Sequence, residues 1–468
     1  MVYLNPFTRI RNNILSKFEF ISGKENVLSS IEDRICYSYD ATRQEYLPDL
    51  VVIPGSREEI SEILKLANYY KIPVVVRGSG TGLSGGALAV RGGIVLVTTK
   101  LNKILDIDEK NLYVVVEPGV ITGNLHNTVE NLGFFYPPDP SSLKVSTIGG
   151  NISHNAGGPR ALKYGVTRDY VRALELVLPD GNVLNSGSKT VKSVTGYDLT
   201  RLIVGSEGTL AIITKAILKL IPKPEKTITF LSSYKDLEIA AEAVVEMARK
   251  KLIPSTIEIM DETTISAVKD FVPGIIPEGA ESILLIEIDG YEDEAKRQEE
   301  ILLKILHHSN AEEILKAEND MEREKLWTAR RSALSALSRI KPSTIIEDAT
   351  VPVDKVPDLI RGIQELSKKY LLTIGTFGHA GDGNLHPTLL TDMRIGLEKE
   401  KVEKVTHEIF NRALSLGGTL SGEHGIGIMK SKFLKMEVKD EGYRIMKGIK
   451  KLFDPNNILN PGKIFEDD

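Results

Sequence analysis

The chain has 468 residues, a length that predicts two or three domains. Its 41% hydrophobic and 26% charged residues are typical of a globular protein, and a net charge of −5 argues against a general nucleic-acid binder. Cys36 is the only cysteine, which excludes internal disulfides, thiolate zinc sites and iron–sulfur clusters held by this chain, and we expect it to be a small buried side chain.

The sequence contains no apolar run near the roughly 20 residues that cross a bilayer. Residues 1–20 also lack the apolar segment and cleavage site of a signal peptide. We therefore expect a cytoplasmic protein, and contact with a membrane surface stays open.

In chain order, the first clear helix follows Pro54-Gly55. Ser56 and Glu59 form the pattern of a capping box, and apolar residues then recur at helical spacing from Ile60 to Ala67. A strand at Ile72–Val76 leads directly into a glycine-rich stretch. Further elements complete an α+β pattern: strands at Gly93–Thr98 and Tyr113–Glu117, and a helix near Thr122–Leu132.

A second compositional zone begins near Pro222-Lys223-Pro224. Its elements follow the order β-α-β-β-α-β, which predicts a ferredoxin-like sandwich. They are Thr227–Leu231, Leu237–Arg249, Ser255–Met260, Ser282–Ile288, Asp293–His307 and Glu312–Ala317. The turn-rich tail, Asp454–Lys463, is expected to pack back on the body of the protein.

The stretch Arg77–Gly86 invites comparison with a dinucleotide-binding loop. Such a loop runs from a strand through glycines into a helix whose N-terminus faces the pyrophosphate. Here no helix follows, because Gly92-Gly93 lead into another strand. Structural turns are one explanation. The other is a nest of backbone N–H groups that binds phosphate without a helix.

Three more glycine-bearing segments favour a bound ligand over simple turns. They are Pro137–Ser142 with Thr147–Gly158, then Tyr164-Gly165 with Asp180-Gly181, and Gly205–Leu210. Glycine allows a backbone to approach a planar ring or a diphosphate closely. The spread of these segments suits a long, extended cofactor.

The histidines point to a second chemistry. Two of the eight stand in Gly378-His379-Ala380-Gly381-Asp382-Gly383-Asn384-Leu385-His386-Pro387, and another in Ser421-Gly422-Glu423-His424-Gly425. On one straight strand, His379 and His386 would face opposite ways, but a turn between them could bring both rings together. Two imidazoles and a carboxylate form a three-ligand metal site with open positions. The alternative is a set of hydrogen-bonded turn residues.

With these motifs in place, the chain resembles the FAD-linked oxidases of the vanillyl-alcohol-oxidase/PCMH fold. The matching branch contains D-lactate dehydrogenase, D-2-hydroxyglutarate dehydrogenase and the glycolate oxidase FAD subunit. The resemblance covers roughly Tyr37 to Lys463 and includes Thr195-Gly196-Tyr197-Asp198. It implies an α+β fold with a PCMH-type FAD-binding domain at 1–221, a ferredoxin-like substrate domain at 222–416, and a segment at 417–468 that returns to the FAD domain.

The resemblance also implies which residues bind FAD. A group around the glycine loop would bind the pyrophosphate: Arg77, Gly78, Ser79, Gly80, Thr81, Gly82 and Leu83. A second group would line the flavin: Pro138, Asp139, Ser142, Thr147, Gly150, Asn151 and Ser153. A third would contact the rest of the cofactor: Glu207, Gly208, Ile213 and Asn460. Some relatives attach FAD through a histidine ahead of the loop, and because Arg77 holds that place we expect non-covalent FAD.

The same resemblance implies a division of catalytic roles. His379, His386 and Glu423 would bind a divalent metal, with zinc expected first and manganese or iron as alternatives. His424 would be the base that takes the hydroxyl proton, a role suited to its ordinary pKa of about 6.5. Arg330, three residues after Trp327, would grip the substrate carboxylate, and the alternative for this helix is a solvated basic face. Arg331 is expected to be on that face.

The expected reaction is oxidation of a small D-2-hydroxy acid, D-lactate or glycolate, to the 2-oxo acid. No lysine precedes Asp348, where the hydroxyglutarate-specific branch has one, so D-2-hydroxyglutarate is the weaker candidate. A non-redox transferase resembling alkylglycerone-phosphate synthase is the alternative from another class. Electrons would leave to an external acceptor or a partner subunit, and a homodimer stays open. His126 and His407 are expected to be satisfied side chains, and His307-His308 to be exposed.

Overall fold

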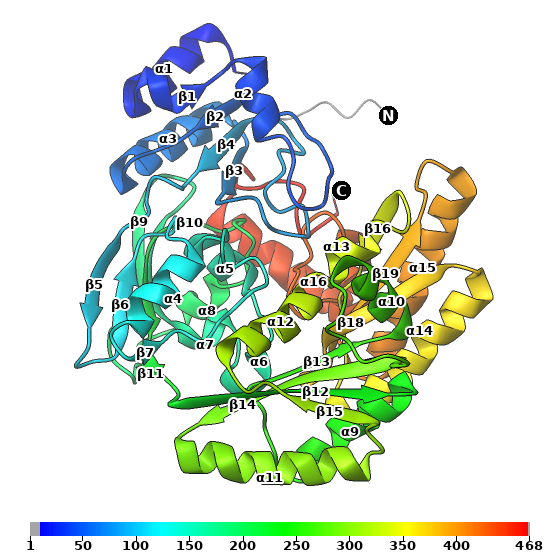
Figure 1. Cartoon of the computed structure of the whole chain (residues 1–468). Coiled ribbons are helices and arrows are strands. Elements are labelled where there is room, and N and C mark those ends of the chain that lie inside the picture. The colour runs from blue at the N-terminus through cyan, green and yellow to red at the C-terminus, as the bar shows by residue number, and fades with distance from the viewer. Residues whose placement is uncertain (1–9, 467–468) are drawn as a thin grey trace. The chain divides into compact units, whose positions relative to one another are not determined.

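The computed structural model describes residues 10–466, which form two compact units (Figure 1). The first unit contains the chain up to Ala156, Val166–Lys223 and the chain from Glu423 onward. The second contains Gly157–Gly165 and Pro224–Gly422. The sequence-based boundaries were 221/222 and 416/417. The short segment in the second unit is tied there because Lys163 Nζ and Tyr164 Oη donate to the Asp289 carboxylate, at 2.6 and 2.9 Å.

A small sheet in the first unit carries the glycine loop. Its strand order is β1-β2-β4-β3, and β2, β4 and β3 run parallel. Ser56 caps the following helix as predicted, since its side chain accepts from Glu59 N–H at 3.2 Å. The elements are α1 Asn12–Ser22, the 3-10 helix Lys24–Asn26, β1 Val27–Leu28, α2 Ile31–Cys36, β2 Leu50–Val52, α3 Arg57–Tyr70, β3 Val74–Arg77 and β4 Ile94–Val97.

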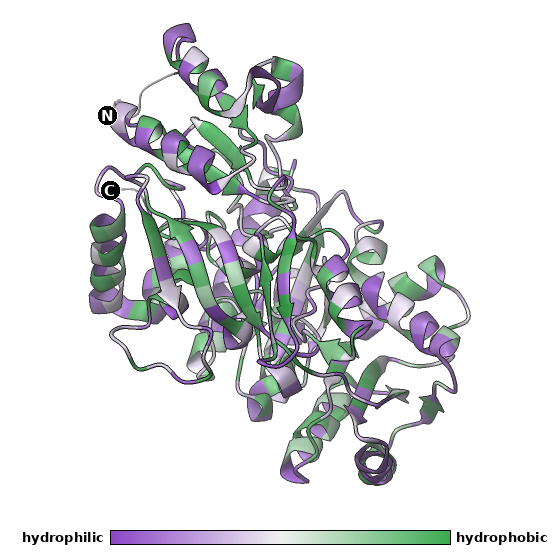
Figure 2. Ribbon diagram, turned by 90° about the vertical axis from the view of Figure 1, so that its left-hand side faces the viewer, coloured by the Kyte–Doolittle hydropathy of each residue, from purple (hydrophilic) through white to green (hydrophobic). Residues whose placement is uncertain are grey.

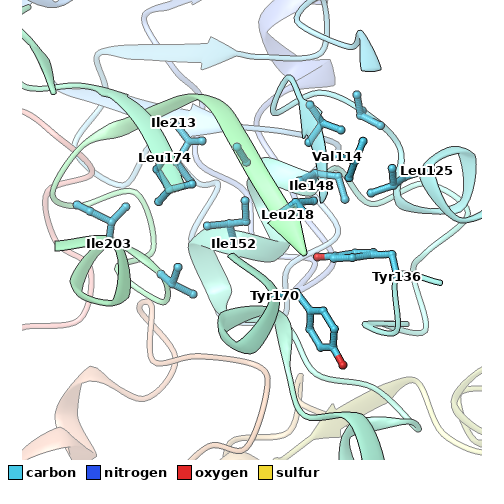
Figure 3. Close-up of a cluster of buried hydrophobic side chains, with 14 of the residues drawn as sticks. Val114, Leu125, Tyr136, Ile148, Ile152, Tyr170, Leu174, Ile203, Ile213 and Leu218 are labelled. Atoms are coloured by element: carbon cyan, nitrogen blue, oxygen red, sulfur yellow. The ribbon is translucent and has the colours of Figure 1, made fainter. Parts of the chain in front are cut away.

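The larger sheet of the first unit is five-stranded and antiparallel, in the order β5-β6-β10-β8-β9. Its inner face packs on α5 in an apolar core that includes Ile148, Ile152 and Tyr170 (Figure 3). The elements are β5 Ile104–Asp108, β6 Tyr113–Val116, α4 Thr122–Glu130, β7 Phe134–Phe135, α5 Ile148–His154, α7 Thr167–Tyr170, β8 Val171–Val177, β9 Val183–Gly187, α8 Leu199–Ile203, β10 Ile212–Lys219 and β11 Ile221–Pro222.

The C-terminal chain returns to this unit, as the predicted fold class requires. The 3-10 helix Ser431–Phe433 precedes α16 Leu434–Phe453, whose residues Ile449 and Phe453 pack on the same apolar core. Beyond α16, Val74 N–H donates to Ile458 O at 2.7 Å and Asn460 N–H donates to Val74 O at 2.8 Å. The tail therefore lies beside β3, the strand that leads into the glycine loop.

The second unit is built on an eight-stranded sheet whose first part matches the predicted ferredoxin-like pattern. The order β15-β12-β14-β13 is antiparallel throughout, and the sheet continues through β18, β19 and β16, with β17 paired to β19. The strands are β12 Lys226–Tyr234, β13 Thr256–Met260, β14 Ser282–Gly290, β15 Glu313–Lys316, β16 Ser343–Ile346, β17 Ala349–Thr350, β18 Thr373–His379 and β19 Asn384–Thr391.

Helices cover both faces of this sheet. Helices α9, α11 and α14 contact one face, and α10, α12 and α13 contact the other (Figure 1). Figure 2 shows strands coloured mainly hydrophobic and helices that alternate hydrophilic and hydrophobic residues, as expected for helices that bury one face. Their bounds are α6 Ala161–Tyr164, α9 Leu237–Arg249, α10 Glu262–Phe271, α11 Glu292–His308, α12 Asp320–Arg331, α13 Ala333–Leu337, the 3-10 helix Val353–Lys355, α14 Val356–Tyr370 and α15 Gly396–Ser415.

Two expectations from the sequence were wrong. Cys36 is exposed, because it is the last residue of the short helix α2 and no residue of that helix is buried. Helix α10 was missed within the ferredoxin-like pattern, although Asp261 caps it by accepting from Thr264 N–H at 2.8 Å. His307 and His308 are exposed as expected. Among residues 10–466, no helix is long and apolar enough to cross a membrane.

Candidate active site

A β-hairpin brings two histidines of the second unit together. His379 ends β18, and His386 in β19 pairs in register with Phe377, so both imidazoles leave the same face of the hairpin. Their ring centroids are 5.2 Å apart with an interplanar angle of 89°, and a ligand atom of each lies within 4.8 Å of the other. Both side chains are buried. The turn at 380–383 thus overcomes the alternation of a straight strand, as expected.

Glu258 of β13 joins His379 to Arg330, and no motif in the sequence predicted this role. Its Oε1 lies 2.5 Å from His379 Nδ1, and its Oε2 accepts from Arg330 Nε at 2.5 Å. Burial opposes the charge of Glu258, but Arg330 and His379 more than offset it and lower the pKa of this carboxyl below its ordinary value. An ionised carboxylate only accepts, so Nδ1 must donate, and in the neutral imidazole Nε2 then keeps its lone pair.

A second buried carboxylate fixes the helix that carries Arg330. Glu287 of β14 accepts from Arg323 Nε at 2.6 Å and Nη2 at 3.0 Å, and from Trp327 Nε1 at 2.7 Å. Burial disfavours the charge of Glu287, yet Arg323 and Trp327 outweigh it and lower its pKa. These bonds fix α12 along the sheet. Arg330 is therefore buried and lies with its guanidinium carbon 4.8 Å from the Phe377 ring centroid, which rules out a solvated face.

Other residues for which the sequence predicted an ordinary structural role have that role. Arg331 is 41% exposed at its side chain and pairs with Glu324. Elsewhere, His126 Nε2 lies 3.0 Å from Pro138 O, and His407 Nδ1 lies 2.9 Å from the Asn411 amide. Both are satisfied side chains.

Polar groups surround the start of β19 in the second unit. Ser421 Oγ donates to Asp348 Oδ2 at 2.6 Å, and Asp348 Oδ1 lies 3.9 Å from His386 Nδ1. A Cβ added at Gly422 would lie 2.3 Å from Asn384 Nδ2 in β19 and 2.3 Å from Thr350 Oγ1 in β17. The backbone at Gly422 therefore packs directly on these two strands. Glu423 is the next residue, and successive Cα atoms are 3.8 Å apart. Glu423 itself is the first residue of the segment that returns to the first unit.

The donor set of the second unit fits a divalent metal. Two buried imidazoles lie together, and the Glu258 carboxylate orients that of His379, which is the usual support of a histidine ligand. In the part of the chain that the structure describes, Asn384 Oδ1 and Thr350 Oγ1 are also buried without a hydrogen-bond partner. Nitrogen and oxygen donors without thiolate suit zinc, manganese or iron.

The glycine loop of the first unit fits an anionic cofactor. No helix separates β3 from β4, as the sequence indicated. Residues 78–83 are partly or fully exposed, and within residues 10–466 none of the N–H groups of 79–83 donates to another protein group. A Cβ at Gly78 would lie 2.2 Å from Thr147 Oγ1, so the loop runs against the start of α5. Free N–H groups beside a helix N-terminus form an anion-binding nest.

Several predicted cofactor residues have their side chains engaged in the local structure. Thr147 caps α5 by accepting from Gly150 N–H at 3.3 Å, Asn151 Nδ2 donates to Thr122 Oγ1 at 2.8 Å, and Ser153 Oγ donates to Gly149 O at 2.8 Å. These bonds hold α5 as a platform. Pro138, Asp139 and Ser142 lie in the coil before it.

The side chains of Arg77 and Ile213, both predicted to bind FAD, are engaged in contacts within the protein. Arg77 Nη1 donates to Tyr39 O at 2.8 Å, and its guanidinium lies under Gly80, where an added Cβ would be 2.2 Å from Nη2. Arg77 therefore supports the loop from below. Ile213 belongs to the apolar core of Figure 3, which leaves its main chain as the part that could contact a cofactor.

Glu207 and Asn460 tie four segments of the first unit together. The Glu207 carboxylate accepts from Ile426 N–H and Gly427 N–H, each at 2.8 Å. Asn460 Nδ2 donates to Gly86 O at 2.9 Å and to Glu207 O at 2.8 Å, and Lys463 Nζ donates to Leu88 O at 2.6 Å. The glycine loop, the 205–210 turn, the segment after His424 and the tail thus form one cradle. Burial lowers the pKa of Lys463 to about 7.

His154 is a further residue of this cradle, and it was not among the residues predicted from the sequence to bind the cofactor. Its Nε2 lies 3.3 Å from a Cβ built at Gly82 and 3.1 Å from one built at Gly86, while its Nδ1 lies 3.1 Å from one built at Gly425. Nδ1 is buried and has no hydrogen-bond partner among the described residues. The only signal in the sequence was its place inside the Thr147–Gly158 motif.

Comparison with known proteins places these features in a family. Residues 48–187 match the model of the FAD binding domain, and residues 223–464 match that of the FAD linked oxidases, C-terminal domain. The glycolate oxidase subunit GlcD of Bacillus subtilis is 50% identical over 449 residues, with 96% of each chain covered. The D-lactate dehydrogenase of Archaeoglobus fulgidus is 40% identical, over 89% of this chain and 91% of the relative.

Solved structures agree on the fold. p-Cresol methylhydroxylase with substrate bound superimposes with a TM-score of 0.78 at 18% identity, over 98% of each chain. An alkyldihydroxyacetonephosphate synthase gives a TM-score of 0.74 at 18% identity, over 98% of this chain and 86% of the other.

Proposed function

The chain belongs to the FAD-linked oxidase family and is a FAD-dependent oxidoreductase, and from this premise we propose that it oxidises a small D-2-hydroxy acid, with D-lactate and glycolate as first candidates. The observation that carries the proposal is the buried cluster in which Glu258 joins His379 to Arg330. Within one set of hydrogen bonds, this cluster holds Arg330, a cation that can bind the substrate carboxylate, and His379, a ligand for a metal ion. Relatives named glycolate oxidase subunit and D-lactate dehydrogenase support this substrate class.

Arg330 is proposed to bind the substrate carboxylate. Its Nε is held by Glu258, and its terminal nitrogens carry the donors that a bidentate contact requires. Glu287 fixes the helix underneath, so the guanidinium is oriented before substrate arrives. With the carboxylate bound in this way, the hydroxyl-bearing carbon of the substrate would be held at a fixed distance from the Arg330 guanidinium, which we call the substrate clamp.

His379, His386 and Glu423 are proposed to hold a divalent metal, with zinc first and manganese or iron as alternatives. When bound, such an ion lowers the pKa of the substrate hydroxyl and fixes its orientation. The adjacent His424 is proposed to take the hydroxyl proton on a ring nitrogen. The bonds from Ile426 N–H and Gly427 N–H to Glu207 fix the backbone just after it.

FAD is proposed to bind non-covalently in the cradle of the first unit. When bound, FAD supplies at N5 the acceptor for the hydride from the substrate Cα. The free N–H groups of residues 79–83 support a role for this loop at the pyrophosphate. Arg77 occupies the place of the histidine that anchors FAD in some relatives, and it is already bonded to Tyr39.

The preference for a short substrate rests on the strand that precedes Asp348. The residues there are Ile345, Ile346 and Glu347, so no lysine is available for a second carboxylate. D-2-hydroxyglutarate is accordingly the weaker candidate. The transferase alternative draws only on likeness of fold, since the alkyldihydroxyacetonephosphate synthase is 18% identical.

Electrons are proposed to leave this chain to a partner subunit or another external acceptor. A single cysteine cannot ligate an iron–sulfur cluster, so an internal relay of that kind is absent. The Bacillus subtilis relative is itself named as a subunit.

Anaerobic mixing tests the proposal directly. The purified flavoprotein is mixed without oxygen with D-lactate, L-lactate, glycolate or D-2-hydroxyglutarate, and the absorbance of the oxidised flavin is followed. Bleaching by D-lactate or glycolate, but not by L-lactate, is expected. Faster bleaching by D-2-hydroxyglutarate would reverse the substrate assignment, and no bleaching by any acid would refute the function.

A further inference from the structure

We propose that Glu258 is a positioning residue that couples the metal site to the substrate clamp, because one buried carboxylate holds both His379 and Arg330. The inference rests on the function proposed above and deepens it. It predicts that metal affinity and affinity for the substrate carboxylate change together when Glu258 is altered. Neither its sequence position nor any motif marks this residue.

The geometry divides the carboxylate between its two partners. Oε1 serves His379 and Oε2 serves Arg330, each at 2.5 Å, and the Glu258 side chain is completely buried. The three residues come from β13, β18 and α12, and Glu258 is the register partner of His379 across the sheet. His379 and Arg330 are 3% and 7% exposed, so solvent offers little substitute for the carboxylate.

The surroundings leave few other orientations for the two partners. Arg330 lies over the Phe377 ring, 4.8 Å from its centroid, and the same ring lies 5.6 Å from the His386 imidazole. Rotation of the guanidinium away from Glu258 would abandon both the ion pair and this ring contact. The hydrogen bond to His379 Nδ1 also selects the tautomer whose Nε2 can ligate a metal.

Glu258→Gln separates these roles from packing. Glutamine has nearly the same shape but one acceptor oxygen, whereas His379 Nδ1–H and Arg330 Nε–H both require an acceptor. One of the two partners must then face the amide NH₂ group. His379 can respond by moving its proton to Nε2, which removes the ligand lone pair, and Arg330 can respond by leaving the clamp orientation.

Glu287→Gln is the matched control. Glu287 is likewise buried, lies on the neighbouring strand β14 and accepts from an arginine of α12, but it contacts neither His379 nor Arg330. A purely structural effect of losing a buried carboxylate under α12 would appear equally in both variants. Because Glu287 also fixes α12, KM is expected to change in both variants, whereas a loss of zinc affinity specific to the coupling would appear only at Glu258.

The experiment measures zinc affinity of the flavin-loaded protein by competition with a chromophoric chelator, together with KM and kcat for D-lactate. We expect Glu258→Gln to bind zinc about 10–100-fold more weakly and to raise KM, with flavin retained. We expect Glu287→Gln to lower the unfolding temperature while zinc affinity stays within twofold. Should Glu258→Gln fail to fold, Glu258→Asp and Glu287→Asp, which keep two acceptors on a shorter stem, are compared by the same zinc competition.

Parent-like zinc affinity in the Glu258 variant, or an equal loss in the Glu287 variant, would overturn the coupling. If the parent protein binds no zinc, manganese or iron, the proposed metal site fails and the coupling fails with it. If the parent binds zinc but none of the hydroxy acids bleaches its flavin, the substrate proposal fails, and the zinc comparison alone still decides the role of Glu258.

Discussion

Replacement of Glu207 by glutamine tests whether the cradle of the first unit depends on one buried carboxylate. Glu207 is 5% exposed and accepts from Ile426 N–H and Gly427 N–H at 2.8 Å each. Its φ of 52° is left-handed, and glutamine at the same position would carry the same backbone strain, so the substitution changes only the carboxylate.

The magnitude follows from the donors that are left behind. Glutamine offers one oxygen to two N–H groups, so one buried donor loses its acceptor, at about 1–3 kcal/mol, and the other exchanges a charged acceptor for a neutral one, at roughly 1 kcal/mol. A total of about 2–4 kcal/mol corresponds to a fall in Tm of roughly 4–16 °C for a domain of this size.

Calorimetry and hydrogen exchange measure the two parts of this effect. We expect a lower Tm and faster exchange of the Ile426 and Gly427 amides, with loss of turnover because His424 lies on the released segment. Glu109→Gln, in an exposed turn, is the control and should change neither quantity. An unchanged Tm together with unchanged amide protection would refute the reasoning.

Three further predictions use other residues. His424→Ala should keep FAD and metal but lose turnover by about 10²–10⁴-fold, and near-normal turnover measured at saturating substrate would remove His424 as the base. Burial raises the pKa of Asp261 to about 6 in the folded protein, above its ordinary value of 3.8, so its stabilising contribution is present at low pH and is lost as pH rises through about 6. The unfolding free energy of Asp261→Asn relative to the parent should therefore increase between about pH 4 and pH 7. A constant difference in urea titrations would contradict this. Precipitation in acid should release all flavin into the supernatant, whereas flavin retained in the pellet would indicate a covalent bond.

Local patterns were sufficient for much of the architecture. Glycines that run from β3 into β4 predicted a cradle without a helix, and the order of strands and helices after Pro222 predicted the ferredoxin-like part of the sheet. Helix α9 was predicted at Leu237–Arg249 and begins and ends at those residues. These features depend on short-range spacing, turn residues and capping, which a sequence displays directly.

Some residues of the candidate site could be predicted from the sequence, and others could not. The paired histidine motif indicated that a turn could bring His379 and His386 together, and the hairpin does so. No such pattern marked Glu258. In β13, Thr256, Glu258 and Met260 alternate with Ile257 and Ile259, and this alternation is typical of a strand with one face exposed to solvent. Every residue of β13 is buried, since helices cover both faces of this sheet.

What the sequence by itself determined, then, was the family, the candidate residues for the chemistry and the local elements that present them. Only the tertiary structure decided how those residues are supported. The carboxylate of Glu258 meets two partners that are 72 and 121 residues away in the chain. Such a contact exists only after β13, β18 and α12 have packed, because the cost of burying a carboxylate is recovered only when both partners are in place.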